Sequence, residues 1–200
     1  MEEYITIYNR INELLESNMF ELSTSFLFKV HGYIFNGIMD NAGCIRSTNI
    51  RKEEEILNGD SVMYSNYDNI MSYLKYDFGN EKKNDYSKLD MDSVIDNITD
   101  FTIRLWLTHP FREGNTRTIS VFIRMYLKKM GYSVNNKLFL KYFTFYRNAL
   151  VLASYETSYM YGTKEYLRLF YKKMIFDNSI DIDNIDIYHF DSVKKRIRFK

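Results

Sequence analysis

The sequence predicts an all-α fold that carries one small β-hairpin, and two observations support this prediction. The chain has one proline in 200 residues, so few positions block a helix. Apolar residues recur every three or four positions over long stretches, which is the period of an amphipathic helix. With 46% hydrophobic and 17% aromatic residues, the chain can close one sizeable core.

Charge and length limit the classes of partner. The 27 basic and 26 acidic residues nearly cancel, so we expect neither nucleic acid nor an anionic membrane as a partner. No apolar run approaches the roughly 18 residues that cross a bilayer. The N-terminus lacks the basic and apolar regions of a signal peptide, and the single cysteine, Cys44, cannot form an internal disulfide. We therefore expect a cytoplasmic protein in which Cys44 is an inert thiol.

The first two expected helices cover residues 4–16 and 23–38, and turn residues at 40–43 end the second. The apolar stripe expected for the first helix consists of Ile5, Tyr8, Ile11 and Leu15. The buried face expected for the second consists of Phe26, Leu27, Val30, Ile34 and Phe35. His31 lies on this second helix, where we expect it to pack as a core residue.

A β-hairpin is expected within residues 55–64. The turn sequence Asn58-Gly59-Asp60 separates two short apolar segments, which is typical of a hairpin. The apolar side chains of these segments are Ile56, Leu57, Val62 and Met63. An ordinary surface loop is the alternative.

Five further helices are expected at residues 66–76, 91–108, 115–130, 136–159 and 163–176. Pro110 blocks continuation of the helix before it, and Gly131 follows the next helix where a left-handed cap would lie. Trp106 and Met125 lie on apolar helical faces and should be core residues. The tail from Asp177 becomes basic at 194–200, and we expect only part of it to be ordered.

The segment 109–117 joins two apolar helices but is almost entirely polar, which marks it as a candidate site. Gly114 and Asn115 at a helix start would direct unpaired N–H groups and the positive end of the helix dipole at one point. Such a point attracts phosphate. Arg117 adds a planar cation suited to phosphate oxygens.

Two residues of the same segment supply acid–base and metal chemistry. Glu113 is a carboxylate of the kind that holds Mg²⁺ beside phosphates, and His109 can accept a proton near neutral pH. Each residue alone has a structural alternative, as a helix cap, a helix-end charge or a surface ion pair. Their co-occurrence within nine positions favours magnesium-assisted nucleotide or phosphate chemistry.

Residues 109–117 resemble the Fic family signature HPFx(D/E)GNGR, with Thr116 in place of the second glycine. Residues 31–35 and 41–50 resemble the family's upstream segment, and 146–150 resemble the stretch that follows the motif. The match covers about residues 22–176. The resemblance implies a Fic-type helical bundle with a β-hairpin flap at 22–176, preceded by an N-terminal, regulatory helix at 1–21 and followed by a tail at 177–200.

The resemblance also implies a protein adenylyltransferase that uses ATP and Mg²⁺. His109 would deprotonate a Ser, Thr or Tyr hydroxyl of the target, Glu113 would hold Mg²⁺, and Arg117 would bind the β-phosphate. The phosphates would lie against the backbone of Gly114 to Thr116 and the side chain of Asn115. Tyr146 and Asn148 are candidates for the base and ribose pocket, with core packing as the alternative for Tyr146. The hairpin would be the flap on which the target docks.

The sequence departs from the family pattern at two positions of the motif. Ser120 stands where the family often has a second arginine for the γ-phosphate, and Thr116 adds a side chain where glycine lets the backbone approach the phosphates. The closest match to the family's inhibitory motif is Ser17 to Glu21, but it lacks the usual last residue and lies just before the core helix, so coincidence is the better explanation.

These departures leave two alternatives to AMP transfer open. One is a Fic-like transferase of a phosphoryl or other phosphate-linked group, and the other is a non-catalytic nucleotide-binding module. For the adenylyltransferase, the expected partners are a hydroxyl-bearing protein substrate, the chain itself and an inhibitory partner protein.

Overall fold

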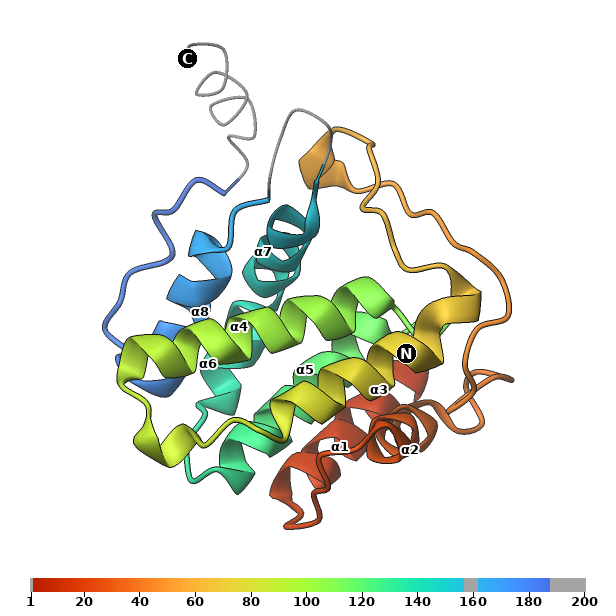
Figure 1. Ribbon diagram of the computed structural model, residues 1–200, viewed down its shortest axis with the longest axis horizontal. Coiled ribbons are helices and arrows are strands. Elements are labelled where there is room, and N and C mark those ends of the chain that lie inside the picture. The colour runs from red at the N-terminus through yellow and green to blue at the C-terminus, as the bar shows by residue number, and fades with distance from the viewer. Residues whose placement is uncertain (1, 157–161, 188–200) are drawn as a thin grey trace. The chain divides into compact units, whose positions relative to one another are not determined.

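The computed structural model describes residues 2–156 and 162–187, and in that part of the chain all regular secondary structure is helical, joined by loops (Figure 1). The all-α prediction is thus confirmed. None of its described helices is long and apolar enough to cross a membrane. The elements, in chain order, are α1 (Glu2–Glu16), α2 (Thr24–Phe35), η1 (Glu55–Leu57), η2 (Tyr67–Asn69), α3 (Ile70–Glu81), η3 (Tyr86–Lys88), α4 (Met91–Thr108), α5 (Asn115–Lys129), α6 (Asn136–Lys141), α7 (Phe143–Ser154) and α8 (Glu165–Ile175).

The described residues divide into two compact units. The first comprises residues 2–49, 65–89 and 104–133, and the second comprises 50–64, 90–103, 134–156 and 162–187. The helix α4 contributes its beginning to the second unit and its last residues to the first. The loop at 109–117 therefore belongs to the first unit.

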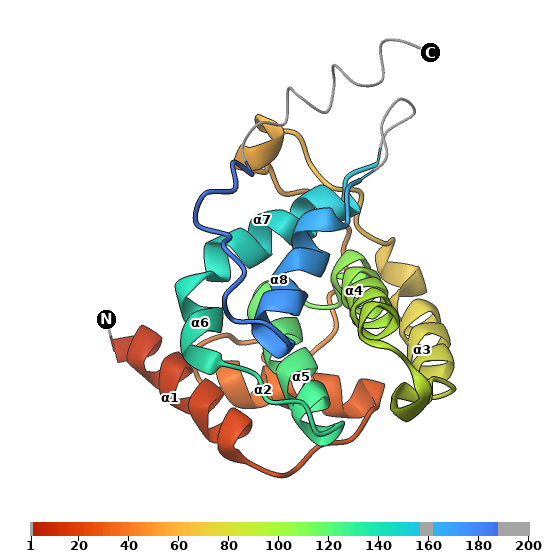
Figure 2. The same cartoon turned by 90° about the vertical axis from the view of Figure 1, so that its left-hand side faces the viewer.

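In the first unit, α1 and α2 pack on each other and on α5 (Figure 2). The α2 N-cap is Ser23, whose side chain accepts a hydrogen bond from Phe26 N at 3.1 Å. Lys128, near the end of α5, donates to the carbonyls that end α1, those of Leu15, Glu16 and Ser17. The C-terminal ends of α1 and α5 therefore lie together.

The buried face of α1 differs from the predicted stripe. Ile5 and Tyr8 are 56% and 51% exposed, whereas Ile7, Leu14 and Leu15 are buried. Residues 7, 14 and 15 share a face because seven residues make nearly two helical turns. Of the predicted stripe, Leu15 is buried as expected, but Ile5 and Tyr8 are not. A neighbouring stripe is equally periodic in the sequence, so periodicity alone could not decide which stripe faces the core.

Glu81, the last residue of α3, has a buried carboxylate. It accepts hydrogen bonds from Tyr86, Tyr126 and Asn84. Burial raises the pKa of Glu81, and these donors partly oppose that shift. Asp77, one turn earlier, pairs with Arg104 at 3.0 Å, and burial likewise raises its pKa.

In the second unit, α7 packs against α8 and η1. The single helix expected at 136–159 is two helices that meet at Tyr142, where φ is −106° and ψ is 21°. The break directs the Tyr142 hydroxyl to Asp183, to which it donates at 2.8 Å. The second of these helices ends at Ser154, and residues 157–159 of the prediction lie outside the described part.

The predicted β-hairpin at residues 55–64 is wrong. Asn58 and Gly59 do form the turn, with φ of 55° and 87°, but the residues before them form the 3₁₀ helix η1. Ile56 and Leu57 are both buried, at 4% and 3% exposure. In a surface hairpin with one face in solvent, only one of two adjacent residues would be buried, whereas the 3₁₀ turn buries both.

Polar contacts attach this loop to α7 within the second unit. The carboxylate of Glu54 is 1% exposed and lies 2.7 Å from the Arg147 guanidinium. Tyr64 donates to the same carboxylate at 3.3 Å, and Tyr155 donates to Asp60 at 2.7 Å. The loop is thus held at both its base and its turn.

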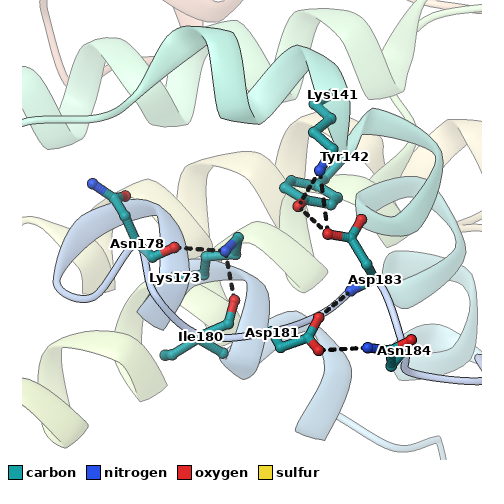
Figure 3. Close-up of polar contacts among 8 residues, drawn as sticks. All are labelled: Lys141, Tyr142, Lys173, Asn178, Ile180, Asp181, Asp183 and Asn184. Carbon is teal, nitrogen blue, oxygen red and sulfur yellow. Dashed lines mark hydrogen bonds and ion pairs between the residues drawn. The ribbon is translucent and has the colours of Figure 1, made fainter.

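The first part of the C-terminal tail is anchored to the same unit (Figure 3). Lys173 donates to the carbonyls of Asn178 and Ile180, and Asp183 accepts from Lys141 and Tyr142. Ile182 and Ile187 in this segment are buried, at 2% and 5% exposure. The basic end of the tail, 194–200, lies outside the described residues.

Candidate functional site

The loop at 109–117 begins where Pro110 prevents α4 from continuing. Proline has no N–H and disfavours the right-handed helical region in the residue before it. His109, the residue before the proline, adopts a left-handed conformation with φ of 46°, which is uncommon for a residue other than glycine. At the other end, Gly114 is the N-cap of α5 with φ of 75°, so the loop turns sharply at both of its limits.

His109 is buried, at 3% exposure, and its ring orientation defines its tautomer. Nδ1 lies 3.1 Å from the carbonyl oxygen of Trp106. A carbonyl only accepts hydrogen bonds, so Nδ1 of the neutral ring carries the hydrogen. The other nitrogen, Nε2, is therefore the one that can accept a proton.

Arg46 holds the backbone around His109. Its guanidinium is buried and donates to carbonyl oxygens from three separate segments of the first unit. Nε donates to His109 O at 2.7 Å, Nη1 to Thr48 O at 2.7 Å, and Nη2 to the carbonyls of Ser65 and Thr108. Burial lowers the pKa of Arg46. We predicted no role for Arg46 from the sequence. Its partners lie up to 63 positions away, so no local sequence pattern around residue 46 points to them.

His31 packs in the core, as expected, and also contacts the motif loop. Its Nδ1 accepts from Gly43 N at 2.7 Å, so Nε2 carries the hydrogen and donates to Glu113 O at 3.1 Å. Its ring stacks on Phe111 at 3.8 Å between centroids. Burial and the Arg117 charge lower the pKa of His31 to about 4. His31 therefore stays neutral near pH 7, and it supports the loop through its contacts with Glu113 O and the Phe111 ring.

The folded-state pKa of His31, about 4, predicts a loss of stability in acid. In the unfolded chain a histidine titrates near pH 6.5, so the stabilisation is complete above that pH and is lost as the pH falls towards 4. Between pH 7 and pH 4 we expect a loss on the order of 3 kcal/mol in the free energy of unfolding from this residue. Urea titrations at several pH values measure it.

The control is His31→Asn, which can still accept from Gly43 N but does not titrate. Asp77 and Glu81, whose pKa values are raised, gain stability as the pH falls. Their effect is the same in both proteins, so the difference between wild type and His31→Asn isolates His31. Parallel pH curves for the two proteins would contradict the prediction.

Gly114 and Asn115 shape the start of α5. A Cβ on Gly114 would lie 2.5 Å from Phe35 Cε2 and 3.3 Å from His31 Nε2, so only glycine fits at this φ and in this space. The Asn115 side chain is buried and forms two hydrogen bonds with the Phe111 backbone, at 2.9 and 2.7 Å. These two bonds fix the backbone of the loop at Phe111 relative to the start of α5.

The first turn of α5 carries donors suited to an anion. The first N–H with a helical acceptor is that of Thr118, which bonds Gly114 O at 3.0 Å. The N–H groups of Asn115, Thr116 and Arg117 precede it and have no helical acceptor. The Arg117 guanidinium lies 4.9 Å from the centre of the Phe35 ring, and Glu113 is exposed beside it. Burial lowers the pKa of Arg117, while Tyr4 and Glu113 raise it.

The two departures from the family signature have defined contacts. Ser120 is 2% exposed and donates to Arg117 O at 2.8 Å, inside its own helix. The Thr116 hydroxyl accepts from Trp106 Nε1 at 3.0 Å. Trp106 and Met125 are buried, as predicted, at 1% and 3% exposure.

The structure brings together His109, Glu113, Gly114, Asn115, Thr116 and Arg117 on one loop and helix start. Ser17 and Glu21 follow α1 at the opposite end of α5, where Lys128 binds Ser17 O. Lys128 lies eleven positions after Arg117 on α5, which corresponds to roughly 16 Å along the helix. An inhibitory role of Glu21 at the loop would need a different arrangement of this segment.

The remaining predicted site residues belong to the second unit. Tyr146 and Asn148 on α7 are buried, at 0% and 7% exposure. The Tyr146 ring packs against Phe139 and Phe170, both at 5.0 Å between centroids. Core packing therefore accounts for Tyr146, and a nucleotide-binding role for either residue stays a prediction.

Comparison with known proteins gives the family. The model of the Fic/DOC family matches residues 21–127, and this chain belongs to that family. Several solved Bartonella structures share its fold. BepC from Bartonella tribocorum, solved with bound AMPPNP, is 17% identical over 87% of this chain and 86% of its own, with a TM-score of 0.66. The N-terminal Fic domain of a VirB-translocated Bep effector from Bartonella quintana, solved with bound ADP, is 17% identical over 87% and 85%, with a TM-score of 0.67.

Proposed function

We propose that this chain is a protein adenylyltransferase, which moves AMP from ATP to a hydroxyl side chain of a protein, its own chain included. One observation carries the proposal: His109 begins the same short loop whose far end is the donor-rich start of α5. Its Nδ1 hydrogen bonds to Trp106 O, so in the neutral ring Nε2 is the nitrogen that carries the lone pair of a base. We call the N–H groups of residues 115–117 and the Arg117 guanidinium the anion cradle. Transfer of a phosphate-linked group to a hydroxyl requires a base and such an anion-binding site close together.

The chemistry follows from these positions. Nε2 of His109 takes the proton of the target hydroxyl, and the oxygen attacks the α-phosphorus of ATP. The bond from that phosphorus to the oxygen bridging to the β-phosphate breaks, and pyrophosphate leaves. The N–H groups of residues 115–117 and the Arg117 guanidinium stabilise the negative charge on the phosphates.

Glu113 is the residue that would hold Mg²⁺. The described residues contain no cluster of three or more His, Cys, Asp or Glu side chains that could bind a metal. The single carboxylate of Glu113 fits Mg²⁺, because protein sites commonly hold this ion through one or two carboxylates together with substrate phosphates and water. When bound, the ion would neutralise phosphate charge in the transition state.

The relatives support a nucleotide substrate, since two of them were solved with AMPPNP and ADP. Target docking is assigned to the loop containing Ile56, Leu57, Val62 and Met63. Met63 is 85% exposed, whereas Ile56, Leu57 and Val62 are buried, so Met63 is the side chain of this loop that a docking target would contact. Control by a separate inhibitory protein completes the proposal.

The test uses purified protein, a cell lysate and ATP labelled at either the α- or the γ-phosphate, with and without Mg²⁺. Transfer of the α-label alone, lost in Glu113→Ala, is expected. Transfer of the γ-label would instead identify a phosphoryl transferase. If nucleotide binds but neither label is transferred, with or without Mg²⁺, the chain acts as a binding module and the proposal is wrong.

A further inference from the structure

Trp106, in the last turn of α4, contacts both His109 and the start of α5. Its carbonyl oxygen lies 3.1 Å from His109 Nδ1, and its ring meets the imidazole edge to face, with 5.5 Å between centroids and 82° between planes. Its indole Nε1 donates to the Thr116 hydroxyl at 3.0 Å. One buried side chain therefore joins the base to the anion cradle.

The sequence explains why the Trp106 carbonyl is available to His109. In a continuing helix it would accept from the N–H of the residue four positions later, but that residue is Pro110, which has no N–H. The imidazole takes the place of the missing donor. Since the His109 backbone is held in a left-handed conformation, the direction of Nε2 depends on this carbonyl and on the indole ring beside it.

Thr116 fixes the other end of the indole. Trp106 is 1% exposed, and a buried indole N–H without an acceptor is unfavourable. A glycine at position 116 would offer no side-chain acceptor there, whereas the Thr116 hydroxyl supplies one from the first turn of α5. The difference from the family signature is thus matched by a specific partner on α4.

We propose that Trp106 and Thr116 act as a pair of positioning residues for His109: the threonine hydroxyl orients the indole, and the indole and its carbonyl orient the imidazole. Neither residue needs to touch the reacting atoms. The proposal rests on the proposed role of His109 as the base. It assigns the hydroxyl of Thr116 a function in catalysis rather than in holding the nucleotide.

The test compares Thr116→Val, which keeps the shape and removes the hydroxyl, with Thr116→Ser, which keeps the hydroxyl. Thr99→Val is the matched control, because Thr99 is a buried threonine of α4 whose hydroxyl makes no hydrogen bond to the described residues. Trp106 is the only tryptophan, so its indole N–H gives a single peak in a proton–nitrogen correlation spectrum. The ring signals of His109 are followed by NMR as the pH is varied.

In Thr116→Val we expect about a tenfold lower kcat, the size expected when one neutral hydrogen bond is lost, with the Kd for ATP changed by less than about twofold. The indole peak should move and its N–H should exchange faster with solvent, and the His109 titration should shift. Thr116→Ser should recover most of the lost kcat and both NMR signatures, and Thr99→Val should affect none of them.

Two results would overturn the inference. In one, Thr116→Val keeps the wild-type kcat and the His109 titration of the parent. In the other, the Kd for ATP weakens in step with the loss of activity, which would mean that Thr116 binds nucleotide. If the wild-type chain transfers nothing, the proposed function fails, yet the indole and imidazole signals still decide whether Thr116 positions His109.

Discussion

Replacing His109 with asparagine is expected to lower kcat for AMP transfer by about a thousandfold, which lies within the usual contribution of a general base. Asparagine can place an amide N–H near the position of Nδ1 and so can keep the hydrogen bond to Trp106 O. It has no counterpart of Nε2. The variant therefore removes the base while leaving the support of the loop in place, and steady-state rates with a labelled target measure the loss.

Nucleotide binding supplies the control for this variant. The groups that would hold the phosphates lie on α5 and its N-cap, and the His109→Asn substitution does not alter them. We expect the Kd for ATP to change by less than about threefold and thermal unfolding to stay close to that of the parent. Transfer at a substantial fraction of the parent rate would show that another group removes the proton.

Helix limits could be predicted wherever a local signal sets them. Pro110 and the positive φ of Gly131 mark the boundaries of α4 and α5, and α4 spans the predicted residues 91–108. The hairpin prediction failed because the turn signal at Asn58 and Gly59 is local, whereas the burial of both Ile56 and Leu57 is a tertiary effect. Turn chemistry specifies where the chain reverses, but not whether a ladder flanks the turn.

The candidate site shows the same division. The grouping of His109, Glu113 and Arg117 on one loop and helix start could be predicted because they lie within nine positions, and their role in catalysis stays a prediction. The support from His31 could not, since its bond to Glu113 O spans 82 positions and depends on a tautomer that only the partners reveal. The pairing of Trp106 with Thr116 spans ten positions, but it crosses from one helix to another and follows no helical period.

Arg46→Ala is expected to produce the largest loss of stability, about 3 kcal/mol or more in the free energy of unfolding. The carbonyls of Thr48, Ser65, Thr108 and His109 would all lose a donor inside the protein. No backbone N–H can replace a planar fork that reaches four oxygens at once. Urea unfolding followed by circular dichroism measures the change.

Arg46→Lys separates the charge from the geometry. Lysine keeps the cation but offers one compact ammonium, which cannot reach carbonyls from three segments together. We expect it to recover less than half of the lost stability. Because His109 O accepts from Nε, kcat should fall in this variant even at temperatures where it is fully folded. A lysine variant with the stability and kcat of the parent would show that the buried charge alone matters, and would remove Arg46 from the support of His109.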